Sequence, residues 1–375
     1  MNGSKVVEKQ SEFDEKLGRT REYLEKAKLD GVYLKLRSNF AWITCGGDNR
    51  IVDHSEDGWS GVLVTKSRAV LITDNTEMPR ILDEETAGLP LEKYEYTWYK
   101  VGLRESIIEV CGSTNVGCDM EIEGLKRLGT DFERVQYQLT LQELDRFRRL
   151  GKDTSAIFTR IGHEIEPGMA ETDVAASVSY ELMKKNIQPQ LVLVACDNRI
   201  SDYRHPIPTE QKIKRYVMYV AVAVKWGLNL SITRFVHFGN PPAELLRKKD
   251  AILNIDARLI HNTRPGRRIA DIFKQHRDNF AHFGYPDEWM KLHQGGSASY
   301  RIRDVKATLD TPETERVLLH QAYAWNPSIA GIKSEDTILV MDDKNEIISE
   351  NSGWPLVSID VEGDEVKRAD ILVKK

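Results

Sequence analysis

Two Pro-Gly pairs in matched surroundings constrain the fold of this chain more than any other feature. Pro167-Gly168 and Pro265-Gly266 lie 98 residues apart. Each pair follows a long stretch of helical periodicity, joins it to a second helix, and is succeeded by sequence rich in β-formers. Proline ends a helix because it lacks a backbone donor, and glycine does so because it accepts positive φ. Two such joints in matched contexts predict a domain made of duplicated halves.

The start of the first long helix marks a domain boundary. Thr140-Leu141-Gln142-Glu143 is a capping-box pattern that opens a helix running to about residue 165. Because 375 residues exceed one typical domain, we expect an α/β domain over 1–138 and a second domain over 139–375, together an α+β fold. In the first domain we expect helices at 11–29, 77–86, 103–110 and 121–128, and strands at 32–36, 61–65, 69–73, 94–99 and 114–119.

Composition excludes several classes of partner. The chain is 41% hydrophobic and 30% charged, as in ordinary soluble proteins. Its net charge of -5 and the lack of a basic run predict no nucleic-acid or anionic-membrane partner. No apolar run approaches the 18 or so residues of a membrane span. The four cysteines form no Cys-x-x-Cys pair, and the N-terminus lacks the apolar stretch of a signal peptide, so we expect a cytoplasmic protein.

Five motifs in the second domain carry potential chemistry. They are Arg204-His205-Pro206, Ser231-Ile232-Thr233-Arg234, His293-Gln294-Gly295-Gly296, Asn326-Pro327-Ser328 and Ile332-Lys333-Ser334-Glu335-Asp336. Over about residues 140–350 they resemble the superfamily of creatinase, aminopeptidase P, Xaa-Pro dipeptidase and methionine aminopeptidase. This resemblance implies a pita-bread domain with two pseudo-symmetric halves, behind a creatinase-like or prolidase-like N-terminal domain, and a tendency to form homodimers.

The resemblance also implies five metal-ligand positions, and three of them have changed. Val220 and Ser231 stand where the superfamily has aspartates, and Asn326 stands where it has a glutamate. Only His293 and Glu335 remain. A two-metal centre needs bridging carboxylates to hold its charge, so we expect neither a metal nor another cofactor in this chain.

Metal-free chemistry has a precedent in creatinase, to which the chain is similar. By that resemblance His205 acts as general acid and base, Glu335 holds a cationic or hydrogen-bonding group of the substrate, and His293 completes the catalytic set. Gly295 and Gly296 suggest either close approach to a ligand or a plain loop. Nearby basic groups suit a substrate carboxylate. The expected substrate-binding residues are Arg204, Lys225, Ser231, Arg234, Tyr300, Arg301 and Asn326.

Three functions are consistent with these motifs. The first is a metal-independent enzyme that cleaves or rearranges a C–N bond of amide, amidine or guanidino type in a small polar molecule. The second is a metal-dependent Xaa-Pro aminopeptidase or dipeptidase acting on dipeptide-like substrates. The third is a catalytically inactive binding module of the same fold. The loss of carboxylates favours the first, and the family name favours the second.

Overall fold

The structure is a computed structural model that describes residues 3–375. The chain divides into two compact units. The first runs to Gln142 and also includes Trp226–Leu228, and the second comprises Glu143–Lys225 and Asn229–Lys375. Helices and sheets are present in both units, in agreement with the predicted α+β class.

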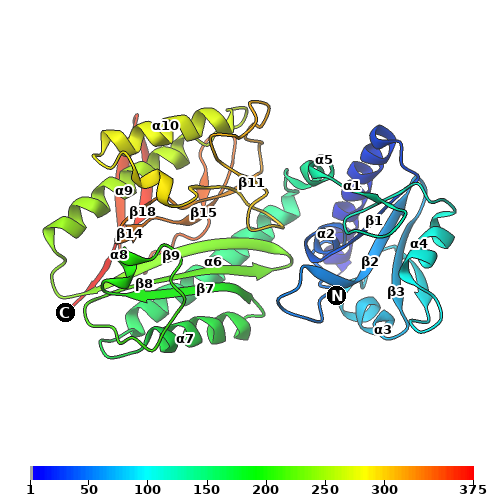
Figure 1. The fold of residues 1–375 in the computed structure, drawn as a ribbon, viewed down its shortest axis with the longest axis horizontal. Helices are drawn as coiled ribbons and strands as arrows, with labels where there is room; N and C mark the ends of the chain where they lie inside the picture. Colours follow the sequence, from blue (N-terminus) through cyan, green and yellow to red (C-terminus); the bar gives the residue numbers. More distant parts are fainter. Residues whose placement is uncertain (1–2) are drawn as a thin grey trace. The chain divides into compact units, whose positions relative to one another are not determined.

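A six-stranded mixed sheet forms the centre of the first unit (Figure 1). Its strands are β1 (Gly31–Leu36), β2 (Asp57–Thr65), β3 (Ala69–Asp74), β4 (Glu92–Tyr96), β5 (Val116–Cys118) and β6 (Lys126–Arg127). They lie in the order β4-β3-β2-β1-β5-β6. The expected hairpin is confirmed, because β2 and β3 pair antiparallel with Val64 opposite Ala69.

Helices cover this sheet. Ile107 and Val110 pack with Tyr33, Leu63 and Val70 in one hydrophobic cluster. These two residues belong to α4 (Leu103–Cys111), whereas α1 (Gly3–Ala27) contacts β1 and β2. The shorter elements are α2 (Arg37–Ile43), α3 (Met78–Arg80), η1 (Ile81–Glu85), α5 (Thr130–Glu133) and η2 (Arg134–Gln136).

The helix expected at 121–128 is wrong. Gly124 has a φ of 74°, which breaks a helix, and the Leu125 amide closes a turn onto the Ile122 carbonyl. The following residues form β6, which pairs in parallel with β5. Sheet pairing therefore overrides the helical tendency of this Leu- and Lys-containing stretch.

The second unit repeats one structural joint, which confirms the predicted duplication. The amide of Gly168 donates to the carbonyl of Ile213, and the amide of Gly266 donates to the carbonyl of Val317, each at 2.8 Å. Both glycines have positive φ, 92° and 83°. The first joint links α6 (Leu141–Glu164) to α7 (Glu171–Lys184), and the second links α9 (Ala243–Asn262) to α10 (Ile269–His282).

Two larger sheets and two strand pairs complete the second unit. One sheet has the order β19-β9-β8-β7, and the other has the order β11-β10-β12-β15-β16. The first contains β7 (Gln188–Cys196), β8 (Tyr216–Lys225), β9 (Leu228–Phe238) and β19 (Leu372–Lys374). The second contains β10 (Gly295–Ser297), β11 (Val305–Lys306), β12 (Ala322–Trp325), β15 (Asp336–Leu339) and β16 (Glu346–Ile347). The pairs are β13 (Ser328–Ile329) with β14 (Ile332–Lys333), and β17 (Leu356–Val361) with β18 (Asp364–Ala369). The remaining short helices are α8 (Arg199–Asp202) and η3 (Glu288–Lys291).

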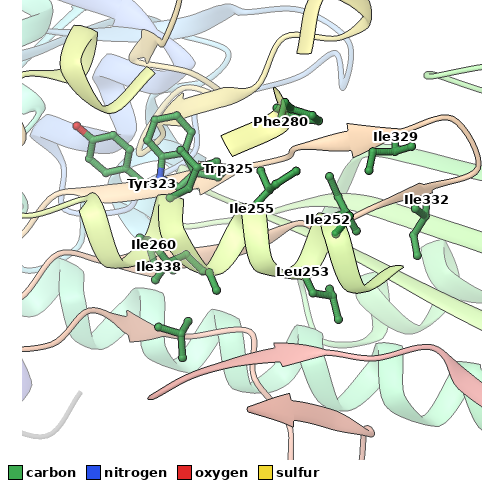
Figure 2. Packing of buried hydrophobic residues seen from close by; sticks show 14 of the residues in the cluster. Ile252, Leu253, Ile255, Ile260, Phe280, Tyr323, Trp325, Ile329, Ile332 and Ile338 are labelled. Atoms are coloured by element: carbon green, nitrogen blue, oxygen red, sulfur yellow. The ribbon is translucent and has the colours of Figure 1, made fainter. Parts of the chain in front are cut away.

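Helix α9 lies in the core of the second unit because apolar residues cover two of its sides. Ile252 and Ile255 belong to the same buried cluster as Trp325 and Ile329, and Figure 2 shows them between α9 and the strands. Leu253 points away from these residues in the same view. The helix contacts β12, β13 and β14 as well as β17 and β18. Helix α9 therefore packs beneath the segments around residues 326–336.

Among the helices of residues 3–375, none combines the length and the apolar character needed to cross a membrane.

Candidate functional site

Three residues far apart in the sequence converge in the second unit. His205 lies in the loop between α8 and β8, His293 lies between η3 and β10, and Glu335 immediately precedes β15. The two imidazole centroids are 6.0 Å apart. The charge of Glu335 acts on the pKa of both histidines. The structure therefore brings together the three residues that the motifs predict as catalytic.

Glu335 is a buried carboxylate whose two oxygens both face cations. Lys333 Nζ lies 2.7 Å from Oε2, and an Arg303 guanidinium nitrogen lies 3.7 Å from Oε1. The Thr233 hydroxyl also donates to Oε2 at 2.7 Å. Burial alone would raise the pKa of Glu335, but the charges of Lys333 and Arg303 outweigh burial and hold that pKa below its usual value. Glu335 is therefore ionised and compensated by protein cations.

Both histidines are uncharged at neutral pH. Burial lowers the pKa of His205, the charge of Lys333 lowers it further, and Glu335 acts in the opposite direction. For His293, burial and the charges of Arg303 and Lys306 lower the pKa to about 4. His205 is the more exposed of the two. A neutral imidazole that meets solvent can accept a proton from water.

A buried histidine anchors the loop that carries His293. His276 on α10 bonds through Nε2 to the side-chain oxygen of Gln294 at 2.9 Å. The amide nitrogen of Gln294 donates in turn to the carbonyl oxygens of Trp289 and Leu292. The residue next to His293 is therefore tied to α10 and to the preceding turn.

This anchor predicts acid sensitivity. Burial lowers the pKa of His276 from 6.5 to about 4, so protonation favours the unfolded chain. Stability from this group is present above pH 6.5 and is lost as the pH falls toward 4. We expect the free energy of unfolding to fall by up to about 3 kcal/mol more in the wild type than in His276→Gln over this range. Denaturant titrations at several pH values measure this difference, and parallel pH curves would contradict it.

An ion network lies behind Glu335 and accounts for the neighbouring motif residues. Asp336 accepts from Arg234 at 2.9 Å and from Arg368 at 2.8 Å. Arg368 also lies 2.6 Å from Asp256, and all four residues are at most 4% exposed. We call Asp256, Arg368, Asp336 and Arg234 the buried ion network. Thr233 of β9 thus binds Glu335, and the neighbouring Arg234 binds Asp336 at the start of β15.

Three of the predicted substrate-binding residues are bonded to other groups of the protein. Arg234 is engaged in the buried ion network, and its proposed contact with substrate stays a prediction that these bonds do not support. The Tyr300 hydroxyl donates to Glu143 at 2.6 Å. Lys225 lies at the end of β8, and its ammonium donates to the Lys185 carbonyl. These bonds join the three residues to partners other than Glu335.

Other predicted residues lie nearer to the motifs of the site. Arg204, beside His205, donates to the Ser328 hydroxyl at 3.2 Å and pairs with Glu288. Asn326 is buried, and its backbone N–H donates to the Gln294 carbonyl. Ser231 is held by the Thr337 hydroxyl through its backbone. Arg301 lies 4.0 Å from Asp304. Their roles toward a substrate stay predictions.

The paired glycines serve strand packing. A Cβ atom on Gly295 would lie 2.3 Å from the Ala324 oxygen, and one on Gly296 would lie 2.0 Å from the Val305 oxygen. Gly295 and Gly296 have φ values of 105° and 148°. The close approach expected at this motif is therefore that of β11 and β12, and these contacts explain the glycines without a ligand.

The residues present do not fit a two-metal centre. Val220 packs in the hydrophobic cluster of the second unit and offers no donor. Within residues 3–375, no group of three or more His, Cys, Asp or Glu side chains is arranged to hold a metal ion. Glu335, the remaining carboxylate, already has a cation at each oxygen. Two divalent ions would need bridging carboxylates that this site lacks.

Lys333 and Arg303 are site residues that the motif analysis did not identify. Lys333 lies two positions before Glu335, and alternation along an extended segment places such residues on the same side. That spacing was a usable signal. Arg303 lies in the irregular segment between β10 and β11, where no periodicity predicts direction. Its contact with Glu335 follows only from the fold.

Known proteins share both sequence and fold with this chain. A sequence model of metallopeptidase family M24 matches residues 145–342, more than half of the chain. A Xaa-Pro dipeptidase from Pyrococcus horikoshii is 22% identical over 350 residues, which cover 88% of this chain and 95% of the relative.

Solved structures show the same architecture. A Xaa-Pro dipeptidase from Bacillus anthracis superposes with a TM-score of 0.76 at 18% identity, covering 96% of this chain and 100% of its own. The N-terminal domain of the FACT complex subunit SPT16 from Cicer arietinum has a TM-score of 0.67 at 10% identity, covering 91% and 97%. By its matched sequence and its pita-bread fold, the chain belongs to metallopeptidase family M24, as a divergent member that lacks most of the expected metal ligands.

Proposed function

We propose that the chain hydrolyses a C–N bond in a small dipeptide-like substrate, with His205 as the residue that moves the proton. The observation that carries this proposal is the meeting of His205 with His293, Lys333 and Glu335 in one site. A neutral, solvent-exposed imidazole beside fixed charges is suited to general acid and base catalysis. Such a group contributes roughly 10² to 10⁴ to a rate when it is correctly positioned.

The chemistry requires one proton to move twice. His205 takes a proton from water as the water oxygen attacks the substrate carbonyl carbon. The C–N bond then breaks, and the imidazolium returns the proton to the departing nitrogen. In this proposal Lys333 and Arg303 stabilise the substrate oxygen that gains negative charge, and their near-complete burial supports this role. Water plus an amide thereby gives an acid and an amine.

Peptide-like substrates are favoured over amidine or guanidino compounds. The family match is to peptidases, and the Pyrococcus horikoshii relative is named as a Xaa-Pro dipeptidase. This preference reverses the order expected from the motifs, in which the Xaa-Pro peptidase stood second. A metal-dependent mechanism remains the second candidate, because the family match is to metallopeptidases. The metal-free mechanism stays a prediction, supported by the donor set described above.

A substrate panel tests the proposal. Chelator-treated protein is incubated with Xaa-Pro dipeptides, other dipeptides, amidines and guanidino acids, and the products are identified by mass spectrometry. We expect hydrolysis of at least one dipeptide, at a rate that EDTA does not change. Hydrolysis that appears only with added Mn²⁺ or Zn²⁺ would favour the metal-dependent candidate, and binding without hydrolysis of any compound would overturn the enzymatic proposal.

A binding module is the candidate that such a negative result would favour. The structural likeness to the N-terminal domain of SPT16 places a subunit of a larger complex among the proteins with this fold. In that case Glu335→Gln would change the affinity for a ligand, and no reaction would be lost.

Cytoplasmic location and homodimeric assembly belong to the same proposal. Light scattering on the purified protein measures the assembly directly, and we expect a mass of twice 42.9 kDa.

A further inference from the structure

We propose that Lys333 is a resident cation that takes over the charge of a metal ion beside Glu335 and excludes divalent cations from the site. The inference goes beyond the proposed hydrolysis, because it concerns what the site binds in the absence of any substrate. It begins from the disagreement between the M24 family match and the residues present.

Distance and burial support this role for Lys333. Its ammonium lies 2.7 Å from Glu335 Oε2, and the side chain is only 7% exposed. The partner carboxylate is 5% exposed, so solvent screens the pair poorly. Arg303 is close to the other oxygen at 3.7 Å, and its side chain is 10% exposed. A metal ion approaching Glu335 would meet two positive charges at short range.

The two remaining ligand positions explain why exclusion matters. His293 and Glu335 stand where the superfamily binds metal, and Glu335 is a buried carboxylate. Without the ammonium, the charge of this carboxylate would attract a divalent cation. With the ammonium in place, the carboxylate is already neutralised.

The pairing with Glu335 is also specific to Lys333. Lys306 is exposed on β11, and its charge acts on His293. Lys333, by contrast, donates a hydrogen bond to the carboxylate itself. The two lysines therefore provide a matched comparison, because each variant removes one positive charge from the same unit and only one removes the partner of Glu335.

Zinc binding without substrate tests the proposal. Wild type, Lys333→Gln, Lys333→Met and Lys306→Gln are freed of metal and titrated with Zn²⁺ by calorimetry, and thermal unfolding is recorded with and without Zn²⁺. Glutamine keeps a hydrogen-bond donor near Glu335, and methionine keeps the packing, so at least one variant should retain the fold. We expect both Lys333 variants to bind Zn²⁺ about 10- to 100-fold more tightly than the wild type, and Lys306→Gln to change the Zn²⁺ affinity less than either Lys333 variant.

Two results would overturn the inference. One is stoichiometric Zn²⁺ in the wild type that is lost in Glu335→Gln, because the ammonium then fails to exclude the metal. The other is unchanged Zn²⁺ affinity in folded Lys333 variants. Since no substrate is present, neither result depends on whether the chain hydrolyses a dipeptide, and failure of the substrate panel leaves this test unaffected.

Discussion

His205→Ala should lower kcat by roughly 10² to 10⁴ on any dipeptide that the wild type hydrolyses, while the protein remains folded. The reason is that His205 is the exposed member of the pair of neutral imidazoles and lies beside the cations at Glu335. Steady-state kinetics measure the loss, and circular dichroism checks the fold. His163→Ala is a suitable control, because His163 lies exposed on α6 and the described hydrogen bond of its ring is to the Gly353 carbonyl.

Glu335→Gln separates two roles of the carboxylate in the same assay. A rise in KM alone would mean that Glu335 holds the substrate, whereas a fall in kcat would mean that it acts through His205 or Lys333. Full activity in His205→Ala would refute the assignment of the proton-moving residue. Attention would then shift to His293, since the Tyr300 hydroxyl is bonded to Glu143.

Arg368→Met should destabilise the second unit by about 3 to 5 kcal/mol, the usual cost of leaving a buried charge without its partner. Arg368 is 1% exposed and bridges Asp256 and Asp336 at 2.6 and 2.8 Å. Asp336 keeps Arg234, but Asp256 loses the cation that compensates it. Burial already raises the pKa of Asp256 to about 6 with Arg368 in place. Denaturant unfolding measures the change.

A second substitution provides the control for this loss. Asp256→Asn combined with Arg368→Met removes the uncompensated charge, so the double variant should be more stable than Arg368→Met alone. Equal stability of the single and double variants, or a cost below about 1 kcal/mol for Arg368→Met, would contradict the network's role.

The duplicated halves were predictable because they depend on local chemistry. A proline and a glycine with positive φ end a helix in the same way wherever they occur, and the joints at Gly168 and Gly266 have the same hydrogen bond. The stretch at 121–128 was not predictable by the same means. There, pairing with β5 and the left-handed Gly124 decide the structure, and neither leaves a periodic signal.

The site, like the fold, was predictable in part. The motifs identified His205, His293 and Glu335, because residue type and spacing carry the resemblance. They did not reveal that Arg234 forms a buried ion pair with Asp336, or that Lys333 and Arg303 neutralise Glu335. Which cation meets which carboxylate depends on how β9 packs against Glu335 and the start of β15. A list of basic residues near a motif cannot supply that geometry.

The most direct test of the account is a crystal structure of the protein grown with Mn²⁺ and a non-hydrolysable dipeptide analogue, with anomalous data to locate the metal. We expect the analogue beside His205, the Lys333 ammonium still bonded to Glu335, and no anomalous peak between His293 and Glu335. A Mn²⁺ ion bound to His293 and Glu335, with Lys333 displaced from the carboxylate, would contradict it.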